Sequence, residues 1–518
     1  MNHIYKTVWN ATLGTWTAVQ ETAKSHGKTS SGKAARAASQ GSLVLRFAFT
    51  LVASAALLLS GRAMADALGN QHPVPAGNGN HYCYYDATSQ SVICGDDATK
   101  TVNPISGKTA KAIVIGKGAL NTGESSMAIG LDSRSAGTAS LAVGNSAKAG
   151  ADQAVAVGQH AQANGKWDVS IGRQAGWNAK APNSAAPTGN EGRNIAIGDA
   201  ALKNGLNVNN NMAMGTSAGE NLTGTHNVII GTYANADEAI QSAIAAGSNQ
   251  AQINFKEREV DVLDSTSKRK VKYIDTSSTV AIGHRALATS AGGVAVGQQA
   301  KAFGATTVAI GNSSRALGNN AVAMGNTANA GAAAAIAIGH QVNYQPEVKN
   351  GPTVVTPAAY KQAGASSIAI GTHSHSSALR SIAIGTEAKA TGDRSTALGN
   401  EASAGHVWSV AIGHQAETRG KYALAIGPLA KAGSLSVADG NSWGMAIGYN
   451  AEAGGWGSPI AIGTESKTLG ESPVAIGDFA TAEGNGAVAI GGKRSGKHLP
   501  GQSTYAKGVQ TTALGYLA

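Results

Sequence analysis

The sequence predicts an all-β solenoid in which coils of about 14 residues stack on one another. Three observations support this: a short motif recurs from Lys111 onward, its spacing is regular, and the composition suits close stacking. The 518 residues include 68 Gly and only 5% aromatic side chains, so large side chains cannot fill ordinary globular cores. Such a chain can still bury a large surface area if its backbone stacks closely and repetitively.

The motif reads aliphatic-Ala-aliphatic-Gly-x-x-Ala-x-Ala-x-Gly and occurs 23 times. Fourteen of the 22 intervals between its marker glycines are 14 residues long. Such a period is typical of a repeat architecture in which each unit packs only on its neighbours. The marker glycines are Gly116, 130, 144, 158, 172, 198, 215, 231, 283, 297, 311, 325, 339, 371, 385, 399, 413, 427, 448, 463, 477, 491 and 515.

One copy shows how the unit predicts a coil. Ile382-Ala383-Ile384 alternates large and small residues with a period of two, which indicates a short strand. Gly385 follows, where the backbone turns without a Cβ. Ala388-Lys389-Ala390 is a second alternating strand, and Gly392 supplies the second turn. The sequence therefore predicts two strands and two turns per coil.

The alternation also predicts association between chains. Ala stands at the middle strand position in 20 of 23 copies, although a solvent-facing position would accept polar residues. We therefore expect both strand faces to be packed, one inside the coil and one against another chain. In this interpretation Ile382 and Ile384 point inward, and chains meet at Ala383. The number of chains does not follow from the residues.

Four interruptions divide the predicted array, which spans 111–518. The longest begins with a short helix near Ala236–Ile240 and continues as two alternating strands around the turn Asp264–Ser267. Insertions in solenoids emerge on one face and often bind ligands, but a decorative hairpin or a clasp between chains is the favoured interpretation of this one. The interruptions lie near 173–193, 232–279, 340–366 and 428–443.

The first 65 residues predict an export signal. A basic region of about 42 residues precedes the apolar run Leu43–Leu59, and a small-x-small site follows it. We expect cleavage between Ala65 and Asp66. A membrane anchor is the alternative, but the run after Arg46 has about 13 apolar residues, short of the ~20 that span a bilayer.

The net charge of +10 does not indicate a nucleic-acid partner. Residues 1–65 contribute seven basic side chains and one acidic side chain, or +6, which leaves +4 for the other 453 residues. No basic run with interleaved aromatic residues occurs there, so we expect a solvated surface and no nucleic-acid binding.

Cys83 and Cys94 are the only cysteines, and both follow the predicted cleavage site. An isolated pair in an oxidising compartment predicts one disulfide, which would close a hairpin-like loop within 66–110. Free or metal-binding thiols are the alternative, although two cysteines without a partner set of ligands do not form a zinc site.

The basic N-terminal region resembles the extended signal peptide of large type V secreted proteins. That resemblance implies a Gram-negative cell-surface destination. The matching residues are Met1, Asn2, Tyr5, Lys6, Trp9, Asn10, Gly14, Trp16, Ala18, Val19, Glu21, Ala23, Lys24, Gly27 and Lys28.

The repeats, of the type SIAIGTEAKATGDRS, resemble the head of trimeric autotransporter adhesins with a YadA-like left-handed parallel β-roll. The resemblance covers about 111–518 and implies an intertwined homotrimer that is held on a stalk and anchored in the outer membrane. The sequence departs from that plan because it shows no sustained heptads for a stalk and no membrane anchor. Because Ala518 lies three residues after a marker glycine, we expect a truncated chain.

Five tryptophans follow the export signal, and all fall in turns or interruptions. Exposed aromatic side chains often anchor protein or glycan recognition, so these are candidate ligand contacts. Capping of neighbouring coils is the alternative. The five are Trp167, Trp177, Trp408, Trp443 and Trp456.

No catalytic or cofactor motif accompanies the repeats. His373 and His375 would lie on one side of a strand, and His284, His340 and His414 follow marker glycines. No carboxylate completes a ligand set, so we expect no metal and no cofactor. Phosphate-binding loops and zinc-protease motifs are absent from the sequence, which argues against an enzyme.

The favoured hypothesis is an adhesin head that binds host matrix proteins, cell-surface glycans or copies of itself through many weak contacts. This class of function includes autoaggregation and biofilm formation. A structural spacer or coat without a specific ligand is the first alternative. A solenoid enzyme acting on polysaccharide is the second, and hydrolysis or elimination of a polysaccharide would reveal it.

Overall fold

A computed structural model gives the fold of two compact units, Met1–Ala65 and Asp66–Ala518. The described residues are 5–10, 15–20, 83–86, 90–95, 99–100, 111–179, 192–246, 248, 253, 255–261, 267–345, 348–350, 353–356, 359–433, 443–492 and 503–515.

In the first unit, β1 (Tyr5–Asn10) pairs antiparallel with β2 (Thr15–Gln20), and the backbone register aligns residue 9 with residue 16. The apolar run of the export signal and the predicted cleavage site at Ala65 and Asp66 lie outside the described residues.

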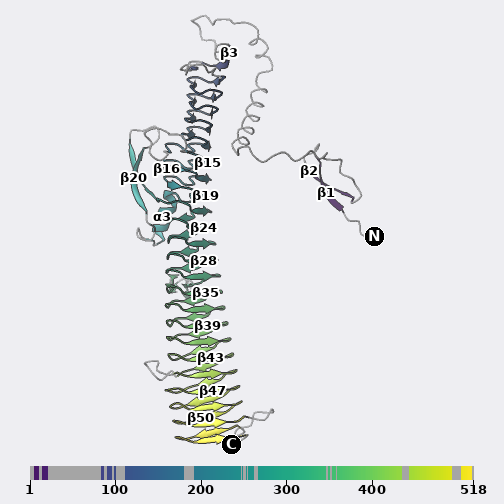
Figure 1. Ribbon diagram of the computed structural model, residues 1–518, viewed down its shortest axis with the longest axis vertical. Coiled ribbons are helices and arrows are strands. Elements are labelled where there is room, and N and C mark those ends of the chain that lie inside the picture. The colour runs from purple at the N-terminus through teal and green to yellow at the C-terminus, as the bar shows by residue number, and fades with distance from the viewer. Residues whose placement is uncertain are drawn as a thin grey trace, which may run out of the picture. The chain divides into compact units, whose positions relative to one another are not determined.

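The second unit is a stack of narrow coils whose first strands form one parallel ladder (Figure 1). Each strand aligns residue for residue with the equivalent strand of the next coil, as Ala383 aligns with Ala397. We call this sheet the long ladder. It consists of β4 (Ser91–Cys94), β6 (Ile113–Ile115), β8 (Met127–Ile129), β10 (Leu141–Val143), β12 (Val155–Val157), β14 (Val169–Ile171), β15 (Ile195–Ile197), β17 (Met212–Met214), β19 (Val228–Ile230), β22 (Val280–Ile282), β24 (Val294–Val296), β26 (Val308–Ile310), β28 (Val322–Met324), β30 (Ile336–Ile338), β35 (Ile368–Ile370), β37 (Ile382–Ile384), β39 (Thr396–Leu398), β41 (Val410–Ile412), β43 (Leu424–Ile426), β45 (Met445–Ile447), β47 (Ile460–Ile462), β49 (Val474–Ile476), β51 (Val488–Ile490) and β53 (Thr512–Leu514).

The second strands of the coils form shorter parallel sheets, which the insertions interrupt. We call them the short ladders. They are β5 (Thr99–Lys100), β7 (Leu120–Asn121), β9 (Arg134–Ser135), β11 (Lys148–Ala149) and β13 (Gln162–Ala163); β16 (Leu206–Asn209) and β18 (Thr223–Thr225); β23 (Leu287–Ala288), β25 (Lys301–Ala302), β27 (Arg315–Ala316) and β29 (Asn329–Ala330); and β36 (His375–Ser376), β38 (Lys389–Ala390), β40 (Ser403–Ala404), β42 (Glu417–Thr418), β44 (Lys431–Ala432), β46 (Glu452–Ala453), β48 (Lys467–Leu469), β50 (Thr481–Glu483) and β52 (Tyr505–Lys507). The predicted two-strand coil is confirmed.

The stack begins earlier than the sequence predicts. β3 (Cys83–Asp86) and β4 form an antiparallel hairpin, and β4 then pairs in parallel with β6. Gly95 takes the place of a marker glycine, with φ of +110°. The predicted start at 111 missed this coil because Cys94 replaces the usual aliphatic residue and Ile93 replaces the middle Ala.

The interior of a regular coil holds only small side chains. In the coil of Gly385, four side chains point inward and are fully buried: Ser381, Ala383, Ala388 and Ala390. The hydroxyl of Ser381 donates to the carbonyl of Ala378 at 2.8 Å, which satisfies the buried oxygen locally. In this coil the two strands lie close together, and Ala and Ser side chains fill the space between them.

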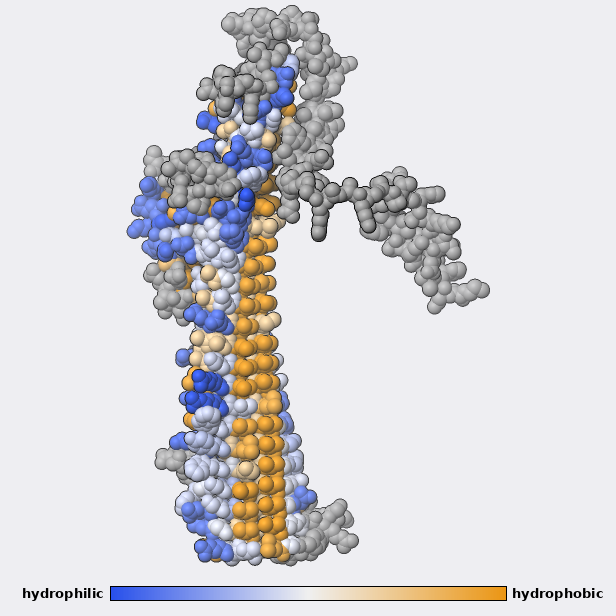
Figure 2. All heavy atoms as spheres, in the orientation of Figure 1, coloured by the Kyte–Doolittle hydropathy of each residue, from blue (hydrophilic) through white to orange (hydrophobic). Residues whose placement is uncertain are grey.

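The predicted orientation of the long-ladder side chains is therefore wrong. Ala383 is buried inside the coil, whereas Ile382 and Ile384 face outward and are only partly covered in the single chain. The two Ile side chains do not fit the narrow interior that Ala383 fills. Repeated along the stack, the outward residues form a continuous apolar band, seen in orange in Figure 2 and called here the aliphatic face.

Each coil turns at a glycine that no other residue can replace without a shift. Gly385 has φ of +135°, and a Cβ added there would lie 2.2 Å from the carbonyl oxygen of Gly399. Glu387 and Arg394 also adopt left-handed conformations, with φ of 56° each. Their backbone N–H groups donate to the preceding coil, that of Arg394 to Leu379 at 2.8 Å. Stacking thus stabilises the turns.

The longest interruption folds as predicted into a helix and a hairpin. The helix α3 (Asp237–Ala245) buries Ile240, and β20 (Lys256–Asp261) pairs antiparallel with β21 (Lys268–Tyr273). Both lie beside the stack in Figure 1. Arg258 of β20 donates to the carbonyl oxygens of Asn204 and Asn221, which fixes the hairpin on the coils.

The other interruptions are only partly described. Between 340 and 366, β31 (Tyr344–Gln345) pairs with β34 (Ala359–Tyr360), and β32 (Val348–Asn350) pairs with β33 (Thr353–Thr356), both antiparallel. Residues 180–191 and 434–442, within the predicted interruptions 173–193 and 428–443, lie outside the described residues. No helix in the described part of the chain is long and apolar enough to cross a membrane.

A buried polar column runs through the coils that carry the longest insertion. The side chains of Asp168, Asn194, Asn211, Asn227 and Thr279 occupy equivalent positions, four residues before a marker glycine. Each carboxylate or amide oxygen accepts from the backbone N–H of the next member, at 2.8 to 3.1 Å. Because every member finds partners, the column is a stable substitute for the small side chains, such as Ala154 and Ser381, that occupy this position in other coils.

Candidate functional site

Exposed aromatic side chains gather at one position of three consecutive coils. Trp408, Tyr422 and Trp443 each lie five residues before a marker glycine and are 48%, 58% and 58% exposed. We call this position, together with its equivalents in other coils, the turn column. Tyr422 and Trp443 meet edge to face, with ring centroids 6.2 Å apart.

The backbone presents these side chains outward. Trp408 and Tyr422 adopt left-handed conformations with φ of 59° each. The N–H of Trp408 donates to the carbonyl of Asp393 at 2.9 Å, and that of Tyr422 to Val407 at 3.0 Å. The turn is therefore held by backbone hydrogen bonds between coils, while the side chain is free to contact a ligand.

Arginine stacks on two tryptophans of the turn column. Arg394 lies over the ring of Trp408 with its Cζ 4.6 Å from the centroid, and Arg193 lies over Trp167 at 5.1 Å. Both arginines come from the turn column of an adjacent coil. A guanidinium on an aromatic face stabilises the pair modestly and keeps the ring upright.

The structure thus brings together only some of the predicted tryptophans. Trp456 is 49% exposed and lies in the coil after that of Trp443. The backbone N–H of Trp443 donates to the carbonyl of Gly457 at 2.7 Å, which joins the two coils. Trp167 belongs to the turn column but to a distant coil. Trp177 is half-buried under Lys203, whose Nζ is 5.6 Å from its ring, so it packs on the next coil.

Sequence reasoning missed Tyr422 and Arg394 as members of this surface. It considered tryptophans alone and did not compare their distances from the marker glycines. The shared offset of five residues was the available signal, because equal offsets in a solenoid place side chains in one column.

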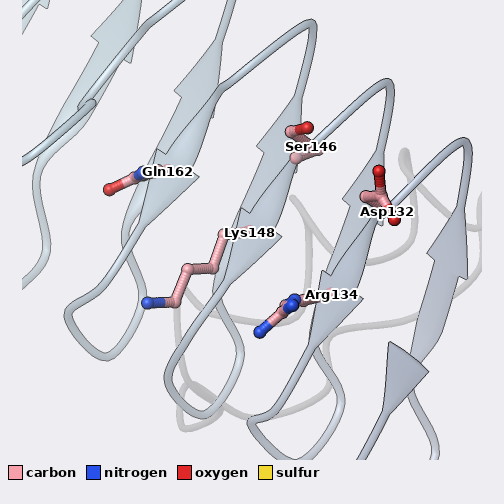
Figure 3. A pocket seen from close by; sticks show the side chains of 6 residues that line it. Asp132, Arg134, Ser146, Lys148 and Gln162 are labelled. Carbon is pink, nitrogen blue, oxygen red and sulfur yellow. The ribbon is translucent and has the colours of Figure 1, made fainter. Parts of the chain in front are cut away.

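The short ladders carry a different, charged surface. Arg134 of β9 and Lys148 of β11 are aligned in register, and both side chains are exposed. With Asp132, Ser146 and Gln162 they line a shallow hollow (Figure 3). The hollow is open and solvated, so it lacks the enclosed geometry of a small-molecule site.

Protein-family models match two parts of the chain, the N-terminal region and the stack of coils. The model of the extended signal peptide of type V secretion systems matches residues 1–50. No curated protein matches the chain. The model of the YadA head domain repeat matches 122–147, 135–161, 277–299, 288–314, 316–341, 363–388, 376–402, 409–430 and 474–493.

The chain belongs to the trimeric autotransporter adhesins. Its stack of coils is a YadA-like head, as the repeats predict. The extended signal peptide and the head together indicate export to the cell surface of a Gram-negative bacterium. Membership of the family implies a homotrimer and anchoring in the outer membrane. YadA-like adhesins are known as non-enzymatic.

The histidines of the adhesin head do not form a common ligand set in the structure. His373 lies in a turn with φ of 55°, and His375 begins β36, so they do not share one strand as predicted. Burial and the charges of Lys361 and Lys389 lower the pKa of His375 to about 4. Within the described residues, no cluster of three metal-ligating side chains occurs, and His284 and His414 lie in separate coils.

Cys83 and Cys94 of the adhesin face each other across the β3–β4 hairpin. Their Cα atoms are 4.0 Å apart, and the structure joins their sulfur atoms. The hairpin forms the first coil of the stack, so the predicted bond would fasten the N-terminal end of the head. Its formation in the exported protein remains a prediction.

Proposed function

We propose that the head attaches the bacterium to host extracellular matrix proteins or cell-surface glycans, and to copies of itself in autoaggregates and biofilms. The observation that supports this most is the turn column at Trp408, Tyr422 and Trp443, where three exposed aromatic rings occupy consecutive coils. Adjacent strands of a sheet lie about 4.8 Å apart, so the rings form a short row along the stack.

The proposed mechanism is multivalent. Each aromatic side chain supplies a large and rigid contact area, but the row has no enclosing pocket. A trimer presents the row three times, so weak contacts on one multivalent ligand or surface add in avidity. Trp167 and Trp456 are further candidate contacts, whereas the packing of Trp177 supports a capping role.

The test is saturable binding of the purified head to immobilised matrix proteins and glycans. Replacing Trp408, Tyr422 and Trp443 together by Ala should weaken the affinity for the ligand that the screen identifies by at least about tenfold. Ala139 and Ala334 occupy the turn column of other coils, with φ of 55° and 54°, so Ala fits the backbone there.

The matched control replaces Thr306 and Asn320 by Ala, because both are exposed members of the same column. Its binding should equal that of the wild type. If the wild-type head shows no saturable binding to any member of the screen, the alternative of a spacer or coat without a specific ligand is favoured.

We further propose that the three chains meet through the aliphatic face. Ile382, Ile384 and their mostly aliphatic equivalents in other coils leave an apolar band along the stack, and contiguous bands of that size mark association surfaces. Replacing Ile384, Ile412 and Ile426 by Asn should reduce the mass measured by light scattering from trimer to monomer. A trimer that survives this change unaltered would place the contact elsewhere.

A further inference from the structure

We propose that Lys301, Arg315 and Tyr360 form a binding site for the oxyanion of an acidic glycan, a carboxylate or a sulfate. Lys301 of β25 and Arg315 of β27 are paired in register on neighbouring strands of a short ladder. Their side chains therefore leave the same face of the sheet, one strand spacing apart. The site is separate from the aromatic row of the turn column. The proposal rests on the proposed adhesive function only in choosing a glycan as the carrier of the oxyanion.

Burial distinguishes this pair from the other cations of the ladders. Arg315 is only 8% exposed, and its Nε has no hydrogen-bond partner. Burial and the neighbouring Arg315 lower the pKa of Lys301 to about 8. Arg134 and Lys148 occupy the same register positions in an earlier ladder, yet both are exposed to water. Because Arg315 is buried and Lys301 is half-buried, their like charges repel more strongly than in water unless an anion accompanies them.

Elsewhere the chain supplies that anion itself. Arg419 is paired with Glu417 and Glu452 at 2.8 and 3.8 Å, and Arg285 is paired with Glu238 at 2.6 Å. Among the described residues, no carboxylate lies within ion-pairing distance of Lys301 or Arg315. The described residues therefore leave the pair without an anionic partner, and a ligand could supply one.

Aromatic rings from the insertion define the chemistry of the site. Tyr360 lies over Arg315, with the guanidinium carbon 4.0 Å from the ring centroid, and Tyr344 meets Tyr360 edge to face at 5.1 Å. The hydroxyl of Tyr360 donates to the carbonyl of Ser313 at 3.3 Å, which holds the ring in place. A fixed guanidinium fork suits a carboxylate or a sulfate, whose oxygens accept two parallel hydrogen bonds.

A sugar that carries such a group fits better than an isolated anion. Amphipathic tyrosine rings offer contact area to the apolar edge of a sugar ring, while the cations hold its charged substituent. Three copies in the trimer would bind one acidic polysaccharide with avidity, although each site alone is small.

The experiment uses the full exported chain and isothermal titration calorimetry. The probes are a carboxylated oligosaccharide (a hyaluronan hexasaccharide), a sulfated one (a heparin hexasaccharide), the neutral chitohexaose and inorganic sulfate. At least one acidic oligosaccharide should bind, chitohexaose should not, and added NaCl should weaken the binding. The comparison of the two acidic probes identifies the oxyanion.

Two substitutions test the residues. Arg315→Gln and Lys301→Met should each weaken binding of the acidic oligosaccharide by about tenfold or more. Arg134→Gln combined with Lys148→Met is the matched control and should leave affinity unchanged. Light scattering and melting verify the fold, and Arg315→Lys, which keeps the charge but lacks the fork, substitutes if Arg315→Gln does not fold.

Three results would overturn the proposal: no acidic oligosaccharide binds, inorganic sulfate alone binds, or Arg315→Gln and Lys301→Met bind like the wild type. The aromatic row is tested separately. The variant lacking Trp408, Tyr422 and Trp443 should bind the acidic oligosaccharide normally, so failure of either proposal is visible without the other.

Discussion

The coils from Ala383 to Ala461 and the coils that carry the longest insertion are built from the same repeat, yet they bury different side chains. The buried apolar cluster of the regular coils consists of alanine alone. The decorated coils add Leu202, Ile229, Ile240 and other large side chains to their buried cluster. Backbone hydrogen bonding and close approach therefore dominate the regular coils, whereas ordinary hydrophobic packing contributes in the decorated ones.

The largest effect should come from the marker glycine of a regular coil. Gly385→Ala places a methyl group 2.2 Å from the carbonyl oxygen of Gly399 and forces a side chain into a left-handed conformation. Strain and overpacking together should destabilise the coil by about 4 kcal/mol. Hydrogen exchange should show lost protection at Ile382–Leu398.

Gly405→Ala is the control for that change. Gly405 has only the hydroxyl of Thr391 within 4 Å of an added Cβ, at 3.8 Å, and no left-handed conformation. Its protection should stay equal or rise slightly. Equal losses in the two variants would show that close stacking does not limit the marker position.

In the decorated coils, a core truncation should have the next largest effect. Ile240→Ala removes a fully buried side chain of α3 and should destabilise the insertion by about 3.5 kcal/mol. Hydrogen exchange should increase in α3 and β21 but not across Ile382–Leu398. Gln241→Ala, on the exposed side of the same helix, should change neither region.

The polar column should make the decorated coils sensitive to pH. Burial raises the pKa of Asp168 to about 6. Three hydrogen bonds donated by Gly165 and Asn194 lower the pKa, but the effect of burial is larger. The pKa of Asp168 is higher in the folded state than in the unfolded state. The stabilisation that protonated Asp168 gives the fold is therefore complete below about pH 4 and is lost as the pH rises through 6. The loss reaches about 3 kcal/mol above pH 7.

The rate of hydrogen exchange at Asn194 and Ile195 should therefore increase between pH 4 and 8 by a larger factor than the intrinsic exchange rate of an unprotected amide does. Asp168→Asn should remove that excess, because the amide cannot ionise. Asp393→Asn, at an exposed turn of the regular coils, should leave it intact. An excess that persists in Asp168→Asn would mean that another group titrates.

The smallest effect should follow a charge reversal on the surface of the regular coils. Lys389 is exposed on β38, so Lys389→Glu should change stability by less than about 0.5 kcal/mol. The pKa of His375, which Lys389 lowers, should rise. An NMR titration of the imidazole measures this shift. Lys431→Glu is the control that should not move the pKa, because Lys431 lies on β44, four strands along the same short ladder from His375 on β36.

The repeat made the fold predictable, because period, alternation and glycine spacing all report the backbone. It did not reveal which side of the strand faces inward. Ile382 and Ala383 alternate in either arrangement, and in this coil the structure places Ala383 in the interior and the two Ile side chains outside. Sequence reasoning assigned the large side chains to the core, as is usual in wider folds.

The candidate sites were predictable to different degrees. Trp408 and Trp443 stand out by residue type, and the offset from the marker glycine relates them to Tyr422. Lys301 and Arg315 have the same offset as the exposed Arg134 and Lys148, so their burial is not encoded in the repeat. It depends on Tyr360, which is 45 residues away from Arg315 and returns through an antiparallel pair.

The left-handed turns give the adhesin freedom to change its surface without changing its fold. The hydrogen bond of Trp408 to Asp393 uses only backbone atoms, and the same bond is made by Asn320, Ala334 and Arg394 in other coils. Any side chain that tolerates this conformation can therefore occupy the position. A population of bacteria could alter what its surface recognises by single codon changes, one coil at a time, while assembly of the stack continued undisturbed.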